Sequence, residues 1–371
     1  MFTRSLFPLL LLGLVVACTE TNEPIATPFD QTHSFRDSIY SKTLGEQRFL
    51  QIYLPGGRRV IPEGSQYPVL YVLDPDAHFG SVVGMVERMS TNVGEERLPE
   101  MIVVGVENTD RVRDMFPIQE QDHFHEFLEQ ELLPYVEQKY ATRPYRVLFG
   151  HSITGLRTIH TSIFYPSLFQ AYIAIDPSLC HEYCRWWEKH QEAIRSFDLG
   201  KNHLFMAMAQ TMGDQDTSAI RLDTSGRASH MNAMMDLAAW MTAKNGEAPA
   251  FNWQYYPEYS HSGVTLRASL DGLESIFSWY RNTSYEEIFA DEISAEASLE
   301  AYLAHYQRVS EQLGYKEIPR EDQVSTLVWY LQNVRQNPQK ALLFAEMNAR
   351  NYPQSQNAQN QMRELQRNFG D

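Results

Sequence analysis

The pattern of hydrophobic positions changes after the first fifty or so residues, from alternating to continuous. Residues 34–42 and 47–54 alternate polar and apolar side chains on either side of Gly45, which predicts a hairpin at the edge of a sheet. The later apolar runs are unbroken, as in parallel strands that are buried on both faces. These predicted strands are residues 69–73, 101–106, 147–149, 171–175, 203–209 and 251–256.

Segments with helical periodicity separate these strands. Alternating helices and buried strands predict a three-layer α/β sandwich with a mostly parallel central sheet. The predicted helices are residues 80–91, 120–140, 153–165, 181–197, 226–244 and 264–280.

The C-terminal part of the chain has helical patterns alone. We therefore divide the chain into an α/β domain, residues 34–283, and a small all-helical extension, residues 296–371. Within the extension, residues 338–353 resemble a tetratricopeptide-type helix–turn–helix. One such unit cannot stack on itself, so it is expected to cap the main domain or to bind a protein partner. The helical stretches are residues 297–313, 321–335, 338–350 and 356–368.

The composition supports a large core and argues against a nucleic-acid partner. Apolar residues make up 43% of the 371 residues, which is typical of a globular protein. Lys and Arg number 31 and Asp and Glu number 47, so the net charge is 31 − 47 = −16. The basic residues form no stripe of the kind that follows a phosphate backbone.

The N-terminus has the features of a bacterial lipoprotein signal. Arg4 precedes a short apolar stretch, residues 6–16, and small residues lead to Cys18. We expect cleavage after residue 17, lipidation of Cys18 and a polar tether over residues 18–33. A plain secretory signal is the alternative. The expected location is the cell envelope, at the outer membrane, facing the periplasm or the cell surface, with the lipid as membrane anchor.

Cys180 and Cys184 are the two other cysteines. They lie one turn apart on a predicted helix, where the geometry does not favour a disulfide, so we expect two thiols. His181 lies between them, but no second ligand cluster accompanies it. The sequence therefore predicts no metal site and no cofactor.

Residues 150–155 read Gly-His-Ser-Ile-Thr-Gly between a predicted strand and a predicted helix. This layout is typical of a nucleophile elbow, a sharp turn that exposes a serine hydroxyl at the carboxyl end of a sheet. Ser152 is the candidate nucleophile. The alternative is a serine that caps an ordinary helix.

A serine nucleophile needs a base and a group that orients it. His261 follows the last predicted strand, where such a base is expected. For the orienting carboxylate we favour Asp216, in the loop after the strand 203–209. Three alternatives stay open, and so does a Ser–His pair without an acid. The alternatives are Asp176, Asp214 and Asp223.

A tetrahedral intermediate also needs backbone N–H donors. Ile153, at the start of the helix after Ser152, is one candidate. Asp76 is the other, because the neighbouring Pro75 has no N–H. Arg111 and Arg113 follow the strand 101–106 at the same sheet end and could bind an anionic group of a substrate or form structural ion pairs.

These segments together resemble the putative-esterase family of α/β hydrolases, which includes esterase D and the ferric-enterobactin esterases. The matching stretches lie between residues 35 and 281. The resemblance implies hydrolysis of a small carboxylic ester through an acyl-enzyme, with Ser152 as nucleophile, His261 as base and no cofactor. The chain departs from the family at Thr154, where a glycine is usual, and at Pro75, where the glycine is an expected oxyanion donor.

Two alternatives to a serine esterase stay open. One, which these departures motivate, is a catalytically impaired homologue that acts as a binding or interaction protein in the envelope. The other is an acyltransferase, which would use the same residues with an acceptor other than water.

Overall fold

The computed structural model describes residues 34–56, 66–91, 96–117, 121–213, 216–245 and 250–369. The predicted signal peptide and tether, with Cys18, lie outside these residues, and so does Asp214. The described residues all belong to one compact unit.

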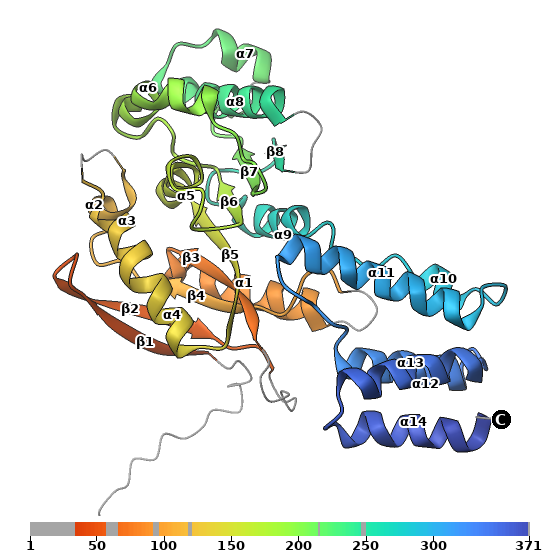
Figure 1. Ribbon diagram of the computed structural model, residues 1–371. Helices are drawn as coiled ribbons and strands as arrows, with labels where there is room; N and C mark the ends of the chain where they lie inside the picture. Colours follow the sequence, from red (N-terminus) through yellow and green to blue (C-terminus); the bar gives the residue numbers. More distant parts are fainter. Residues whose placement is uncertain are drawn as a thin grey trace, which may run out of the picture. The chain divides into compact units, whose positions relative to one another are not determined.

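Eight strands form one sheet in the order β1-β2-β4-β3-β5-β6-β7-β8 (Figure 1). The strand β1 pairs antiparallel with β2, and β2 with β4, whereas the other neighbours pair in parallel. The predicted edge hairpin and parallel sheet are therefore confirmed. The strands are β1 (Ser34–Ser41), β2 (Glu46–Tyr53), β3 (Tyr67–Leu73), β4 (Ile102–Val106), β5 (Thr142–His151), β6 (Ala171–Ile175), β7 (His203–Ala209) and β8 (Phe251–Tyr256).

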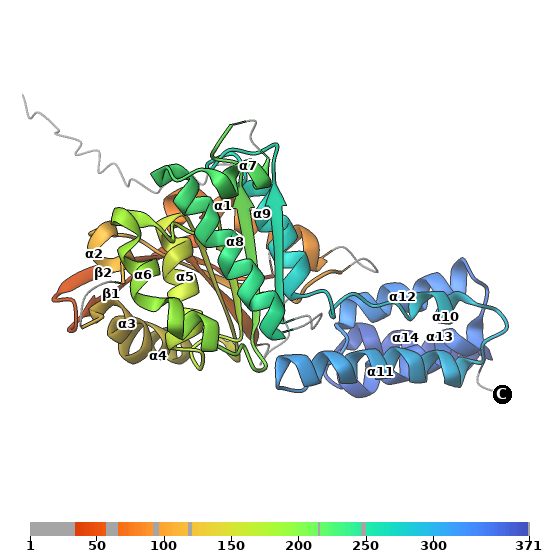
Figure 2. The ribbon, with the colours of Figure 1, turned by 90° about the horizontal axis from the view of Figure 1, so that it is seen from above.

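Helices cover both faces of the sheet (Figures 1 and 2). Alternate strand residues point to opposite faces, and each face packs into its own apolar core. One face is covered by α3 (His123–Phe127), α4 (Leu133–Lys139), α5 (Ile153–Phe164), α6 (His181–Ser196) and α8 (Gly226–Asn245). The other is covered by α1 (Pro75–Thr91) and α9 (Thr265–Ile276). Shorter segments are α2 (Arg111–Met115), the π-helical turn η1 (Leu128–Leu132) and α7 (Thr217–Leu222).

The C-terminal helices pack around a third apolar core. One of them, α11, also contributes Val309 and Leu313 to the core beneath α1 and α9. The Arg320 guanidinium donates to the carbonyl of Ser90 over 3.0 Å. The predicted helical extension is thus present, while its likeness to a tetratricopeptide unit stays a prediction. The helices are α10 (Tyr285–Phe289), α11 (Ala295–Leu313), α12 (Glu321–Asn333), α13 (Pro338–Asn351) and α14 (Gln356–Phe369).

No helix within the described ranges is both long enough and apolar enough to cross a membrane.

The expectation of two free thiols is wrong, because Cys180 and Cys184 form a disulfide. In a regular helix over both cysteines, such a disulfide would be unfavourable. Instead Glu182, Tyr183 and Cys184 all have positive φ values, between 45° and 62°, so the chain kinks at the start of α6. This kink replaces the regular helical geometry on which the expectation depended.

Candidate active site

Ser152 lies in the sharp turn between β5 and α5. Its backbone has φ 64° and ψ −122°, a conformation that few residues other than glycine adopt. Its side chain makes no capping hydrogen bond to α5, so the helix-cap alternative does not hold. The hydroxyl is available at the carboxyl end of the sheet, as the nucleophile-elbow pattern predicts.

Two glycines allow this turn to close. A Cβ at Gly150 would collide with the carbonyl group of Thr154. A Cβ at Gly155 would lie 3.0 Å from the Ile175 carbonyl oxygen and 3.1 Å from Cα of Pro177. Gly155 is therefore the residue that lets α5 approach the end of β6, one position later than the usual pattern.

Thr154 is accommodated because it points to the other side of the turn. Its side chain is fully buried, and its hydroxyl oxygen accepts the His151 backbone N–H over 2.8 Å. The same oxygen lies 3.3 Å from the Asp74 carboxylate. Thr154, where the family usually has a glycine, thus makes a buried contact between the elbow and the segment after β3.

Pro75 is likewise accommodated by the strand beside it. It is the first residue of α1, a position where the missing N–H of proline costs no helical hydrogen bond. Its ring lies against Gly105 of β4, where an added Cβ would be only 2.5 Å from Cβ of Pro75.

The two candidate oxyanion donors each lie in the first turn of a helix. Ile153 is the first residue of α5 and Asp76 the second of α1, so helix geometry leaves both N–H groups without an intrahelical acceptor. Their roles as oxyanion donors stay predictions.

Asp176, at the end of β6, is the carboxylate that contacts His261. Its Oδ2 lies 2.5 Å from Nδ1 of His261, which stands in the segment between β8 and α9. The Asp176 side chain is fully buried, whereas the His261 side chain is 37% exposed. The other carboxylate oxygen accepts the Ala209 N–H over 2.8 Å, which fixes the orientation of the group.

The preference for Asp216 is therefore corrected. The Asp216 carboxylate accepts the Ala219 N–H at the start of α7, as an N-cap residue does. Asp223 ends the same helix, and its carboxylate accepts the Ser225 N–H over 2.7 Å. Asp214 lies outside the described residues. Parallel strands bring several loops to one sheet edge, so chain order alone could not choose among these carboxylates.

One short segment contacts both the serine and the imidazole. The Ile175 carbonyl accepts the Ser152 N–H over 3.0 Å, and Asp176 binds His261. The Ser178 N–H donates to the Ser152 carbonyl over 2.9 Å, and the two hydroxyl oxygens lie 3.2 Å apart. Residues 175–178 thus hold the candidate nucleophile and the candidate base in one neighbourhood.

Two further histidines, His151 and His230, interact with His261. Nε2 of His151 lies 2.9 Å from the His261 carbonyl oxygen, so it carries a proton and donates. Burial, and next the charge of His261, lower the pKa of His151 to about 4, which keeps it neutral at pH 7. Burial also lowers the pKa of His230, which interacts electrostatically with Asp176 and His261. The positions of these two histidines in the sequence did not indicate that they interact with His261.

The two arginines that follow β4 both form ion pairs. Arg111 forms a forked pair with Asp74, with a shortest distance of 2.7 Å. Arg113 binds Glu46 over 2.7 Å and Asp114 over 2.7 Å. Their side chains stay 42% and 37% exposed, so a substrate-binding role stays a prediction beside these structural contacts.

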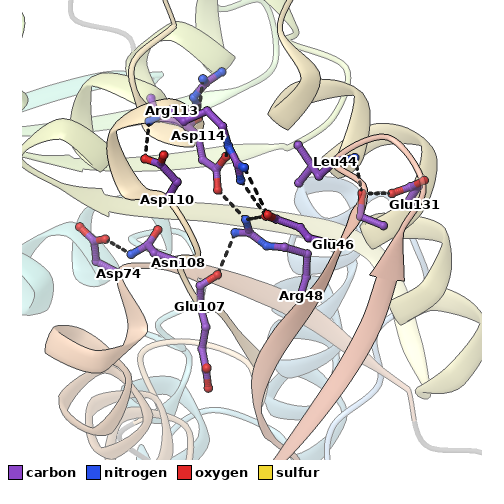
Figure 3. Close-up of polar contacts among 12 residues, drawn as sticks. Leu44, Glu46, Arg48, Asp74, Glu107, Asn108, Asp110, Arg113, Asp114 and Glu131 are labelled. Carbon is purple, nitrogen blue, oxygen red and sulfur yellow. Dashed lines mark hydrogen bonds and ion pairs between the residues drawn. The ribbon is translucent and has the colours of Figure 1, made fainter.

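A buried ion pair that the sequence did not reveal holds this loop on the sheet (Figure 3). Arg48 of β2 and Asp114 of α2 are both almost inaccessible, and their charged groups lie 2.5 Å apart. The Arg48 guanidinium also donates to the Glu107 carbonyl over 2.8 Å. Hydrogen bonds from Arg113, and next from Arg48, hold the pKa of the Glu46 carboxyl at about 2. The Glu46 carboxyl is therefore charged at neutral pH.

The sheet order, the elbow and the Asp–His contact define the protein as an α/β hydrolase. The family model described as "Putative esterase" matches residues 41–264. The chain therefore belongs to this family and is a carboxylic ester hydrolase of the serine-hydrolase type.

Two curated relatives come from Bacillus subtilis (strain 168). The uncharacterized protein YbbA is 25% identical over 204 residues, which are 50% of this chain and 77% of YbbA. The ferri-bacillibactin esterase BesA is 26% identical over 144 residues, which are 32% of this chain and 50% of BesA. The match thus spans half the length of BesA.

Among solved structures, an IroE-like serine hydrolase from Shewanella oneidensis has a TM-score of 0.65 and 24% sequence identity. The alignment covers 99% of that chain and 85% of this one. Residues 1–283 are a smaller part of the chain than the 85% that the alignment covers. The similarity of fold therefore extends into the C-terminal helices.

Proposed function

We propose that this protein cleaves a carboxylic ester through an acyl-enzyme formed on Ser152. In this mechanism His261 removes the hydroxyl proton of Ser152 while Oγ attacks the ester carbonyl carbon. When the tetrahedral intermediate collapses, the imidazolium gives that proton to the departing alcohol. Water then attacks the acyl group, with His261 again as base, and the acid is released.

The segment 175–178 is the observation that carries this proposal. It contacts Ser152 through Ile175 and Ser178, and it orients the imidazole of His261 through Asp176. A proton on Nδ1 that faces the buried carboxylate leaves Nε2 as the basic nitrogen. The Asp176 carboxylate would then stabilise the imidazolium that forms during the reaction.

We propose a small or medium-sized ester as substrate, and esters of the siderophore type as the first class to assay. The support is the relative named ferri-bacillibactin esterase together with the family itself.

Covalent labelling tests the role of Ser152. A fluorophosphonate probe is expected to modify the folded protein, and peptide mapping is expected to place the label on Ser152. The Ser152→Ala variant should take up no label. A folded chain that the probe does not modify would instead favour the impaired binding homologue.

We also propose that the protein lies in the cell envelope, anchored by a lipid on Cys18. The Cys180–Cys184 disulfide supports this, because disulfides persist outside the reducing cytoplasm. Metabolic labelling with palmitate is expected for the full-length chain and should disappear in Cys18→Ala. Equal labelling of the two chains would refute the anchor.

A further inference from the structure

Ser178 is the hydroxyl-bearing residue beside the candidate nucleophile. Its Oγ lies 3.2 Å from Oγ of Ser152, within hydrogen-bonding distance. A backbone bond fixes this approach, because the Ser178 N–H donates to the Ser152 carbonyl over 2.9 Å. The fold thus holds the backbone that carries this hydroxyl beside the reacting oxygen.

The chain on both sides of Ser178 is also fixed. Pro177 packs against Gly155 of α5, and Asp176 is held by the sheet and by His261. On the other side, the Ser178 carbonyl accepts the His181 N–H over 3.1 Å, and the disulfide begins at Cys180. Such preorganisation is what an active-site hydrogen-bond donor requires.

The number of protons decides which hydroxyl donates. A serine hydroxyl has one proton and can accept further hydrogen bonds. In the proposed mechanism Ser152 gives its proton to His261, which rests on the function proposed above. The hydrogen bond between the two hydroxyl groups must then run from Ser178 to Oγ of Ser152.

We propose that Ser178 is a further catalytic residue, which donates a hydrogen bond to Oγ of Ser152 as negative charge develops there. In the acyl-enzyme this Oγ is an ester oxygen and a weak acceptor. During deacylation the bond from Oγ to the acyl carbon breaks, and Oγ takes the electron pair before His261 returns the proton. The donor gains most at this step, because a hydrogen bond strengthens when its acceptor becomes charged.

The proposal predicts a specific kinetic change in Ser178→Ala. Deacylation should slow roughly 10- to 100-fold, the loss expected for a hydrogen bond to a charged oxygen, whereas acylation should slow much less. With p-nitrophenyl acetate, rapid mixing should show a burst of p-nitrophenolate and then slow turnover. The KM should fall together with kcat, because the acyl-enzyme accumulates.

Two further variants separate this role from a structural one. Ser178→Thr keeps the hydroxyl and should restore most of the deacylation rate. Ser162→Ala removes a buried serine hydroxyl of α5 that donates to the Ile159 carbonyl, and it should behave as the unmodified protein. The melting temperature of each full-length variant verifies that it is folded.

Each outcome decides the matter. A Ser178→Ala protein that is folded, labelled at Ser152 and unchanged in deacylation would overturn the role of Ser178 and leave that of Ser152 intact. Equal slowing of acylation and deacylation, with unchanged KM, would also overturn it, since a general distortion acts in that way. Turnover of ester by the Ser152→Ala variant at the rate of the unmodified protein would overturn the proposed function and this inference with it.

Discussion

The Ser152→Ala variant should lose kcat for p-nitrophenyl acetate by roughly 10⁴- to 10⁶-fold, the loss typical of removing a serine nucleophile. The backbone N–H of Ser152 donates one hydrogen bond and its carbonyl accepts others, and alanine retains all of them. The loss should therefore occur without unfolding. Spectrophotometric rates, compared at equal concentrations of folded protein, measure the effect.

A glycine at the same position adds a physical control. At φ 64° a non-glycine residue bears backbone strain of about 1–3 kcal/mol, and the greater flexibility of unfolded glycine offsets part of its relief. Ser152→Gly should thus be as inactive as Ser152→Ala but more stable by about 1 kcal/mol in denaturant unfolding. Substantial turnover by either variant would remove Ser152 from the mechanism.

Asp176→Asn should lower kcat by roughly 10³- to 10⁴-fold, while Asp216→Asn should leave it within about twofold. The asparagine at 176 keeps the size of the side chain, but its amide cannot stabilise an imidazolium and can turn an N–H toward Nδ1 of His261. This would select the wrong tautomer, with the proton on Nε2. Steady-state kinetics of the two variants measure the difference.

Asp216 is a matched control because asparagine caps helices about as well as aspartate. Its variant should keep both α7 and the stability of the protein. If Asp176→Asn kept full activity, the base would work without an acid. If Asp216→Asn were the damaging change, the contact between Asp176 and His261 would have no part in catalysis.

The sequence predicted the sheet well because its strands are buried on both faces and read as unbroken apolar runs. It missed α2, α7 and α10, because five or six residues are too few to show helical periodicity. It also placed the start of α1 at residue 80, although Pro75 at the first helical position is the start signal.

The candidate site was predicted in part. Ser152 and His261 could be selected because one follows a strand in an elbow pattern and the other follows the last strand. Asp176 could not be preferred over Asp216, because both follow strands that end at the same sheet edge. Ser178 gave no signal, since its nearness to Ser152 depends on the close packing of Gly155 against Pro177.

The contribution of α11 to the core under α1 and α9 has a consequence for any shortened form of this chain. Val309 and Leu313 are almost inaccessible there, beside apolar side chains that a protein ending near residue 283 would leave open to water. Exposed apolar surface of this kind promotes association between molecules. We therefore expect the α/β domain and the C-terminal helices to fold as a single unit. A chain truncated between them is expected to aggregate.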